Sequence, residues 1–258
     1  TAGQPIPVAP TQSSVPVAGG VIPPAPAMRT TQTSTPEFKA WFGDSKVVDA
    51  KGEPMVVYHG TINDITKQDG LFWVTPSKKS AGEFADRQAF ANSERGDEDF
   101  READQFSPEF DDVPAAGQNV MPIYASIKKL LDFDEIGQTT TLNEMSDYLA
   151  EKKIMERPDN DVLEDIAMEL STEDHNYTPR STIPIYRVLE ALGAYPDIQK
   201  AGYDGVRIMD TNVRGHPTEA FAVFSPTQIK SAIGNRGTFA PANPAITARP
   251  ATAQAPLA

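Results

Sequence analysis

The chain has no cysteine and only three histidines among its 258 residues. The absence of cysteine excludes a disulfide-stabilised scaffold, a thiolate nucleophile and a cysteine-ligated metal site. The histidines show no metal-ligand spacing such as His-Glu-x-x-His, so the sequence implies no metal. A Gly-x-Ser-x-Gly motif and a glycine-rich phosphate loop are also missing, which argues against a serine hydrolase of that type and against a P-loop enzyme.

Long apolar runs and basic charge are equally scarce. No apolar run approaches the roughly 20 residues that a membrane helix needs, and the amino terminus lacks the charged-then-apolar pattern of a signal peptide. The chain carries 36 Asp and Glu against 23 Lys and Arg, a formal net charge of −13. Non-specific binding of DNA or RNA needs a basic face that displaces phosphate counterions. We therefore expect a soluble protein without a membrane segment or a nucleic-acid partner, and the lack of cysteine fits a cytoplasmic environment.

Negative charge is concentrated in one segment of the chain. Residues 86–112 hold ten acidic and three basic residues. The simplest interpretation is a solvated loop or short helix. The alternatives are a lid over a cleft and a docking surface for a basic partner.

The two ends of the chain differ from its middle in composition. Residues 1–36 contain eight prolines, one charged residue and no aromatic residue. Such a segment buries too little apolar area to offset its chain entropy, and we interpret it as an extended linker. Residues 240–258 repeat the Pro/Ala-rich composition and are expected to form a second tail. Residues 37–239 would then be one domain, and the linkers, together with the initial threonine, suggest a segment of a longer polypeptide.

Short apolar segments in this middle part predict strands. They are residues 56–59, 71–75, 120–127, 206–209 and 220–224. A helical insert is predicted at about residues 142–172, where Pro158 separates two helices, and a third helix at 185–192 is expected to end at Gly193. No strand–helix–strand rhythm is present, which argues against a doubly wound sheet. The pattern favours an α+β domain with a mixed or antiparallel split sheet, in which the insert either supports the sheet or determines target specificity.

The segment Val56-Val57-Tyr58-His59-Gly60-Thr61 is the most informative motif. An apolar, β-branched run that ends at a glycine predicts a buried strand that ends at a cleft. Glycine removes the side chain that would keep a ligand away from the backbone. The His59 ring and the Gly60 amide and carbonyl can then face the same ligand, although a single histidine at a strand end is often structural.

Several motifs occur in an order that resembles a known family. Tyr58-His59-Gly60-Thr61 is followed by Gly70-Leu71-Phe72-Trp73-Val74-Thr75, by Ala81-Gly82-Glu83-Phe84-Ala85, by Gly202-Tyr203-Asp204-Gly205-Val206 and by Phe224-Ser225-Pro226-Thr227-Gln228-Ile229-Lys230. Together they resemble the ADP-ribosyltransferases with the His-Tyr-Glu type of active site. The resemblance is greater still to the ADP-ribosyltransferase-like domains of phage and mobile-element polyvalent proteins, and it covers roughly residues 37–239.

The resemblance implies an ADP-ribosyltransferase-like split β-sheet, with two small sheets that face each other across a cleft for the substrate NAD. It implies that His59 holds a ribose hydroxyl of NAD, that the Gly60 backbone grips the nicotinamide amide, and that Thr61 can add a hydroxyl contact. Phe72 stands where the family has tyrosine, and with Phe84 it would form the aromatic walls around nicotinamide. Both phenylalanines can instead be core residues. Trp73 alternates with Phe72 along the strand and is expected to face the opposite side and pack.

The catalytic carboxylate is expected at Glu219, beside His59 in the cleft. In the family a glutamate usually lies four residues before the phenylalanine of the last motif, and this position is Ala220. Glu219 lies one residue earlier, and a slip of one residue moves a side chain to the other face of a strand. A β-bulge near Pro217-Thr218 would restore its direction. The carboxylate could then stabilise the cation that forms when the nicotinamide–ribose bond breaks, and could polarise the incoming nucleophile.

The resemblance implies three possible functions from different classes. The first is a mono-ADP-ribosyltransferase that modifies a host macromolecule, expected to be a protein. The second is a degenerate transferase-like module that keeps the fold for binding. The third is a virion structural or ejected-protein segment that contacts other virion proteins, so that the protein would be located in the phage virion and then in the bacterial host cytoplasm. His59-Gly60-Thr61 favours the first function, whereas Phe72 and the displaced Glu219 favour the second.

Overall fold

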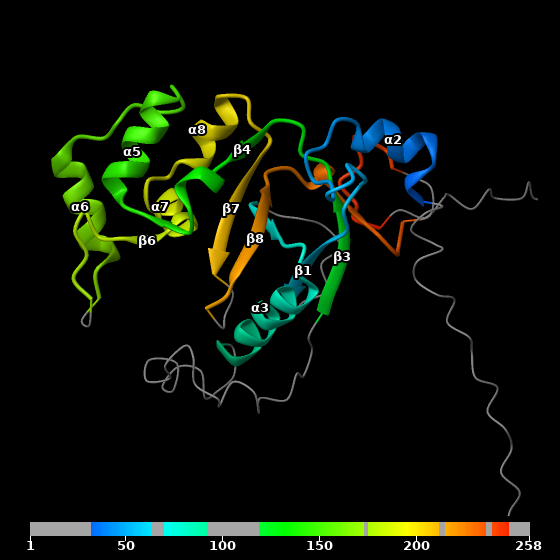
Figure 1. Ribbon diagram of the computed structural model, residues 1–258, viewed down its shortest axis with the longest axis horizontal. Helices are drawn as coiled ribbons and strands as arrows, with labels where there is room; N and C mark the ends of the chain where they lie inside the picture. Colours follow the sequence, from blue (N-terminus) through cyan, green and yellow to red (C-terminus); the bar gives the residue numbers. More distant parts are fainter. Residues whose placement is uncertain are drawn as a thin grey trace, which may run out of the picture.

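The structure is a computed structural model that describes residues 32–62, 70–91, 119–172, 175–211, 215–235 and 239–247 (Figure 1). Most of the acidic segment 86–112 lies outside the described residues, so its predicted character is not tested. The linker residues 1–31 and the tail residues 248–258 also lie outside them.

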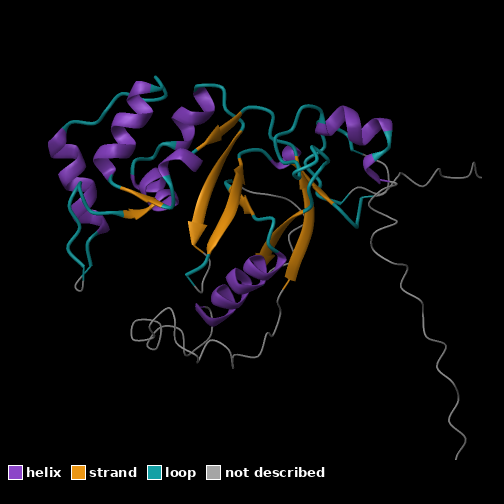
Figure 2. Ribbon diagram, in the orientation of Figure 1, coloured by secondary structure: helices purple, strands orange, loops and turns teal. Residues whose placement is uncertain are grey.

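Two small sheets form the centre of the molecule (Figure 2). One sheet has the strand order β1-β3-β9 and the other has the order β2-β8-β7-β4. The bounds are β1 (Val57–Thr61), β2 (Phe72–Val74), β3 (Asn119–Ala125), β4 (Leu130–Asp132), β7 (Gly205–Thr211), β8 (Pro217–Val223) and β9 (Ile229–Ser231). Neighbouring strands are antiparallel, except that β4 runs parallel to β7. The five predicted strands are present, and the predicted α+β class with a split sheet is confirmed.

An apolar core joins the two sheets. Val57 and Ile123 from the first sheet pack with Phe221 and Val223 from the second, and all four side chains are buried. Side chains alternate along a strand, so the residues between these inward-facing positions lie on the other face of each sheet. On β8, Ala220 and Ala222 therefore belong to a second core, which the helical insert covers.

The helical insert packs on that second face of the four-stranded sheet, and it forms one end of the molecule in Figure 1. It extends beyond the predicted bounds of about 142–172, and we include in it η2 (Asp134–Ile136), β5 (Thr139–Thr140), α5 (Leu142–Glu151), α6 (Asn160–Leu170), β6 (Ile183–Pro184), α7 (Ile185–Ala191) and α8 (Tyr195–Lys200). Thr141 and Glu144 form a reciprocal capping box at the start of α5. Gly193, with φ of +60°, follows α7, because an αL position near a helix end favours glycine.

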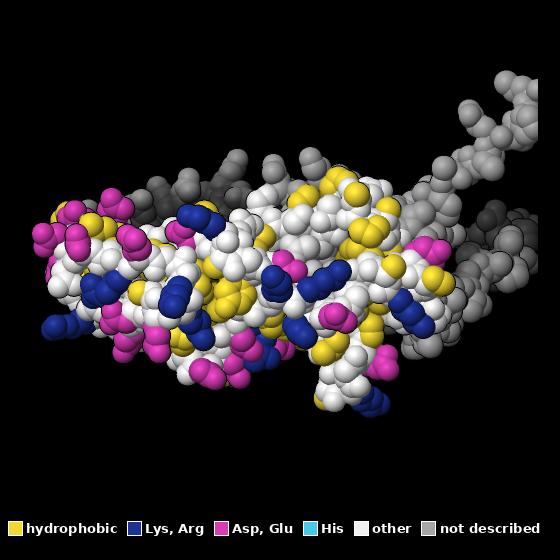
Figure 3. Space-filling model, turned by 90° about the horizontal axis from the view of Figure 1, so that it is seen from above, with side chains coloured by type: hydrophobic (Ala, Val, Ile, Leu, Met, Phe, Trp, Pro, Cys, Tyr) yellow, Lys and Arg dark blue, Asp and Glu magenta, His cyan; other side chains and the backbone are white. Residues whose placement is uncertain are grey.

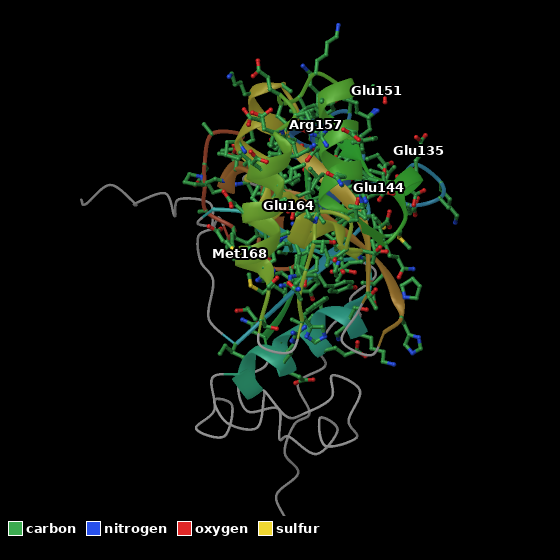
Figure 4. All side chains as sticks on the ribbon, turned by 90° about the vertical axis from the view of Figure 1, so that its left-hand side faces the viewer. Glu135, Glu144, Glu151, Arg157, Glu164 and Met168 are labelled. Carbon is green, nitrogen blue, oxygen red and sulfur yellow. The ribbon has the colours of Figure 1, made fainter. Side chains whose placement is uncertain are left out.

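The buried face of α6 includes only part of its apolar residues. Val162 and Met168 recur at helical spacing with Ile166 and Leu170, which predicts an apolar face, but their side chains are 47% and 69% exposed. The buried residues are instead Leu163 and Ala167, with Ile166 packed beside them. Spacing of three and four residues places these on one stripe, whereas Val162 and Met168 lie outside it. Figure 4 views the insert from its outer side, where Met168 lies among the labelled charged side chains Glu135, Glu144, Glu151, Arg157 and Glu164.

We expected residues 240–258 to form a tail outside the domain, but residues 243–246 contact its core. Ile246 is fully buried in the core between the sheets, and its carbonyl accepts a hydrogen bond from the Ser231 N–H. The Lys230 side chain is also fully buried, and its Nζ donates to the carbonyl oxygens of Asn243 and Ala245. The predicted boundary at residue 239 is therefore wrong, because residues 240–247 supply both a core side chain and the partners of a buried ammonium group.

The amino-terminal boundary also shifts outward. Helix α2 (Pro36–Phe42) begins after Thr35, whose side chain accepts a hydrogen bond from the Phe38 N–H. Its aromatic residues pack on the outer side of β3 around Tyr124. Before it, the Gln32 side-chain amide donates to the carbonyls of Ser231 and Asn235. Residues 32–36 thus belong to the folded domain.

Charge is unevenly distributed over the surface. In Figure 3 acidic side chains gather at the end formed by the helical insert, with lysine and arginine side chains between them. Among the described residues no helix combines the length and apolar character that crossing a membrane requires.

Candidate active site

A cavity of about 350 Å³ opens between β1, α3 (Lys78–Ala91), α7 and the four-stranded sheet. This volume is at the lower end of the range for small-ligand sites. His59 and Gly60 of β1 line it, together with Phe84 of α3. The structure thus brings three of the predicted site residues to one cavity. Their contacts with NAD remain predictions.

The His59 ring is held in a defined orientation. Its Nδ1 lies 2.8 Å from the Trp73 carbonyl oxygen, and the ring stacks on Phe72 with centroids 4.1 Å apart. Because a carbonyl only accepts, Nδ1 must carry the proton in this hydrogen bond. Burial lowers the pKa of His59, an effect that the hydrogen bond to Trp73 partly offsets. At neutral pH the ring is therefore neutral, and its Nε2 is a hydrogen-bond acceptor.

The pKa of His59 predicts a pH dependence of stability. The unfolded chain binds a proton near the ordinary pKa of 6.5, whereas the folded protein resists protonation, so the free energy of unfolding falls as pH drops below about 6.5. The slope contributed by one such group is at most about 1.4 kcal/mol per pH unit. The raised pKa values of Glu190 and Asp210 act in the opposite direction. Urea unfolding between pH 5 and 7.5 measures the free energy of unfolding of the wild type and of His59→Gln. The difference between the two pH dependences is the contribution of His59.

The matched control for this experiment is His175→Gln, because His175 is exposed and outside the cavity. We expect the free energy of unfolding of His59→Gln to rise relative to that of the wild type as pH falls, because the variant has no buried histidine to protonate. A difference that stays constant over this pH range would contradict the prediction.

Gly60 is required by helix packing as well as by the cavity. A Cβ atom at this position would lie 1.6 Å from the Ala81 carbonyl oxygen, far inside van der Waals contact. The first turns of α3 therefore approach the β1 backbone more closely than any other residue would permit. The sequence predicts that Gly60 allows a ligand to approach the backbone. The structure shows that it also allows α3 to pack closely against β1.

A buried hydroxyl network fixes the start of α3, and with it Phe84. Ser77 caps the helix by accepting a hydrogen bond of 3.1 Å from the Ser80 N–H. The Ser80 hydroxyl also accepts from Thr218 of β8, and Thr218 pairs with Thr75. The helix that supplies an aromatic wall is thus tied to β8 and to the residue that follows β2.

Two of the predicted ligand contacts lie elsewhere. Phe72 is buried in the core between the sheets and supports the His59 ring from behind, whereas Trp73 lines the cavity. The prediction had these two side chains reversed, because it assigned the cleft to the wrong face of β2. Thr61 is 2% exposed and does not line the cavity. By alternation it shares a face of β1 with Val57, whose side chain is buried in the core between the sheets.

Glu219 does not reach the cavity. Residues of β7 and β8 pair in constant register from Gly205 with Val223 to Thr211 with Pro217, so no bulge shifts the strand. The Glu219 carboxylate therefore lies on the opposite face from Ala220, which lines the cavity. Its Oε1 lies 3.2 Å from Arg207 Nη1. The expectation that a β-bulge turns the Glu219 carboxylate into the cleft is therefore wrong.

Arg207 gathers several carboxylates at this distal position. Its Nη2 lies 2.7 Å from Asp132 Oδ2 and 3.4 Å from Asp134 Oδ2. The side chains of this cluster are partly exposed, so each pair contributes little to stability. Glu219 is thus part of a surface ionic cluster.

Three residues with shifted pKa values line the cavity and were not predicted from the sequence. Tyr186 and Glu190 come from α7, and Asp210 comes from β7. Burial is the main cause of the raised pKa values of all three side chains. A signal for Asp210 was present, because Val206, Ile208 and Asp210 alternate along a predicted strand. The α7 residues had no such signal, since their helix was expected only to pack or to determine specificity.

No group of three or more metal-ligating side chains lies close together in the described part of the chain. The cavity instead combines aromatic walls, a neutral histidine, an accessible backbone and carboxyl groups. These groups suit a polar organic ligand with an aromatic ring.

Comparison with protein-family models agrees with this fold. The α+β split sheet, with His59-Gly60 at a cavity, is the arrangement expected from the resemblance to ADP-ribosyltransferase-like domains. Residues 49–239 match the model of the family described as ADP-ribosyltransferase in polyvalent proteins, and the chain belongs to this family. No curated protein and no solved structure matches the chain.

Proposed function

We propose that the protein binds NAD in this cavity and transfers its ADP-ribose to a host macromolecule, with a protein as the expected acceptor. The observation that carries the proposal is that one cavity, in a member of this family, joins the His59 ring, the Gly60 backbone and two aromatic side chains. We also propose that the domain belongs to a larger phage polyvalent protein that acts in the host cytoplasm after delivery from the virion. Contacts with other virion proteins would belong to that stage.

The residues present suit the nicotinamide end of NAD. A neutral His59 can accept a hydrogen bond from a ribose hydroxyl, since Nδ1 is already bonded to Trp73. Trp73 and Phe84 offer flat apolar surfaces for the nicotinamide ring. Bound NAD supplies an activated glycosidic bond, and the protein's task is to orient it and to stabilise the charge that develops.

Calorimetry with NAD or a non-hydrolysable analogue tests the binding step. His59→Ala is expected to raise the Kd by roughly fivefold to 150-fold, because it removes a hydrogen bond of about 1–3 kcal/mol in a desolvated cavity. Its melting curve establishes that the variant is folded. His175→Ala, which changes an exposed histidine, serves as the control and should bind like the wild type.

The proposal would be contradicted if the wild-type protein shows neither heat of binding nor a thermal shift at millimolar NAD. A Kd of His59→Ala equal to that of the wild type would remove His59 from the site without removing the site.

A second function is favoured by one specific observation. Ala220 occupies the position on β8 where a carboxylate is expected, and Glu219 lies outside the cavity. A module that has lost catalysis would bind NAD or a related nucleotide without releasing nicotinamide. It would then serve as a binding or virion structural element of the larger protein.

A further inference from the structure

On β8 the cavity is lined by Ala220 and not by a glutamate. The neighbouring strand β7 contributes the carboxylate of Asp210 to the same cavity. We infer that Asp210 of β7 is the catalytic carboxylate of this protein, taking the role that Glu219 does not fill. This inference rests on the proposed NAD-dependent transfer, and it removes the main argument for a degenerate module.

The register of the two strands places Asp210 beside the vacant position. Ile208 pairs with Ala220, and Asp210 pairs with Thr218, the residue two positions before Ala220. Directly paired and alternate residues share a face of the sheet, so Asp210 and Ala220 are diagonal neighbours. Their Cβ atoms are therefore roughly 7–8 Å apart or less. Both residues line the same cavity as His59.

Local contacts hold the Asp210 carboxylate in place. Its Oδ1 accepts a hydrogen bond of 2.7 Å from the Thr211 N–H. The Thr211 hydroxyl in turn donates to Gln138 Oε1 at 3.1 Å, which ties the end of β7 to the insert. A short side chain on a paired strand, held by a backbone donor, is well oriented for a charge that develops at one point.

The surroundings of Asp210 increase the effect of its charge. Burial raises its pKa, while the hydrogen bond from Thr211 and the positive charge of Arg87 lower it in part. A carboxylate with little water around it interacts more strongly with a nearby cation than an exposed one does. Its raised pKa also brings it closer to that of a useful proton acceptor near neutral pH.

Glu190 is the competing carboxylate and is less well placed. It also lines the cavity, but from α7, one helical turn after Tyr186. Within the described part of the chain no hydrogen bond fixes its carboxylate, and it has one more rotatable bond than Asp210. Asp210 lies in the strand directly beside Ala220, and this position favours it.

The reaction assigned to Asp210 is a substitution at ribose C1′ of NAD. The bond between C1′ and the nicotinamide nitrogen breaks, and its electron pair stays on that nitrogen, so nicotinamide leaves as a neutral molecule. A new bond forms between C1′ and the nucleophilic atom of the acceptor, or the oxygen of water. Asp210 stabilises the positive charge near C1′, and the proton of the nucleophile passes to its carboxylate and then to solvent.

The test measures nicotinamide release from NAD by the full chain, with water as the acceptor. Asp210→Asn should lower release by at least about a hundredfold, the usual loss when a partner of the transition-state charge is removed. Its affinity for NAD by calorimetry and its melting temperature should stay close to those of the wild type. Glu219→Gln is the matched control, because it changes a carboxylate on the same sheet outside the cavity and should keep the wild-type rate.

A rescue variant makes the test specific for charge. Ala220→Glu in the Asp210→Asn background returns a carboxylate to the cavity face and should recover at least about tenfold in rate. If Asp210→Asn does not fold, Asp210→Ser, whose hydroxyl can still accept from the Thr211 N–H, replaces it with the same expectation.

The outcomes separate this inference from the function on which it rests. Wild-type release with an unchanged rate in Asp210→Asn would overturn the assignment, as would a hundredfold loss confined to Glu190→Gln. A wild type that binds NAD but releases no nicotinamide would overturn it in favour of the binding module. A wild type that does neither would overturn the proposed function itself.

Discussion

A chain that ends at residue 239 is expected not to fold at 25 °C, whereas a chain that ends at residue 247 should match the full protein in stability. The shorter chain loses Ile246, which is fully buried between the sheets. It also loses the carbonyl oxygens of Asn243 and Ala245, which accept from the buried Lys230 ammonium group. The longer chain keeps all of these contacts.

The magnitudes explain why the effect should be large. Loss of a buried isoleucine side chain costs about 2–5 kcal/mol, and a buried charge left without its partners costs about 3–5 kcal/mol more. Their sum is comparable with the whole stability of an ordinary domain, about 5–15 kcal/mol. Urea unfolding followed by circular dichroism measures the difference between the two chains.

Ile246→Ala in the full chain tests the same contact without truncation. It should lower the free energy of unfolding by about 2–5 kcal/mol. Coincident unfolding curves for the chains that end at 239 and 247 would show that residues 240–247 do not support the core.

Gly60→Ala is expected to destabilise the protein by about 3 kcal/mol or more. The added methyl group would meet the backbone carbonyl of Ala81 at 1.6 Å, and a backbone cannot move aside as the end of a long side chain can. Helix α3 would have to separate from β1, at a cost above that of most overpacked core substitutions. The shift of α3 would also displace Phe84, so NAD binding should weaken as well. Thermal and urea unfolding give the stability change, and calorimetry gives the affinity.

Gly82→Ala is the matched control, because Gly82 directly follows Ala81 in the same helix, α3. Its added methyl group would find only the Val120 Cγ2 atom at 3.9 Å, an ordinary contact. Alanine is a better helix former than glycine, so this variant should be unchanged or more stable by up to about 1 kcal/mol. Equal stability of the two variants would contradict the close approach of α3 to β1.

Much of the fold could be predicted from local patterns in the sequence. Alternating apolar residues such as those of 120–127 identify a strand because neighbouring side chains point to opposite faces. The helices of the insert follow from the spacing of their apolar residues and from stop signals such as Pro158 and Gly193. Less predictable were the short strands β4, β5, β6 and β9, which have two or three residues each and too few positions for a pattern.

For the candidate site too, residues in contiguous motifs were predicted correctly, whereas those that depend on packing or strand register were not. His59 and Gly60 were found because their motif is contiguous, and Phe84 because its segment follows in order. Phe72 was assigned to the wrong face, because alternation shows which residues share a face but not which face meets the cavity. Glu219 was misplaced for a related reason, since only the register with β7 shows that the strand has no bulge.

The sequence by itself determined the class of fold, the strand that carries His59, and the lack of cysteine and of a P-loop motif, because each of these rests on residue types and on spacing within a few positions. Only the tertiary structure decided that Ile246 belongs to the core, that Phe72 supports His59 from behind, and that Asp210 shares a cavity with it. These facts depend on which segments meet in space, and residues 59 and 210 meet only because two sheets and a helix fix their relative positions. Packing and register of that kind leave no local trace in the chain.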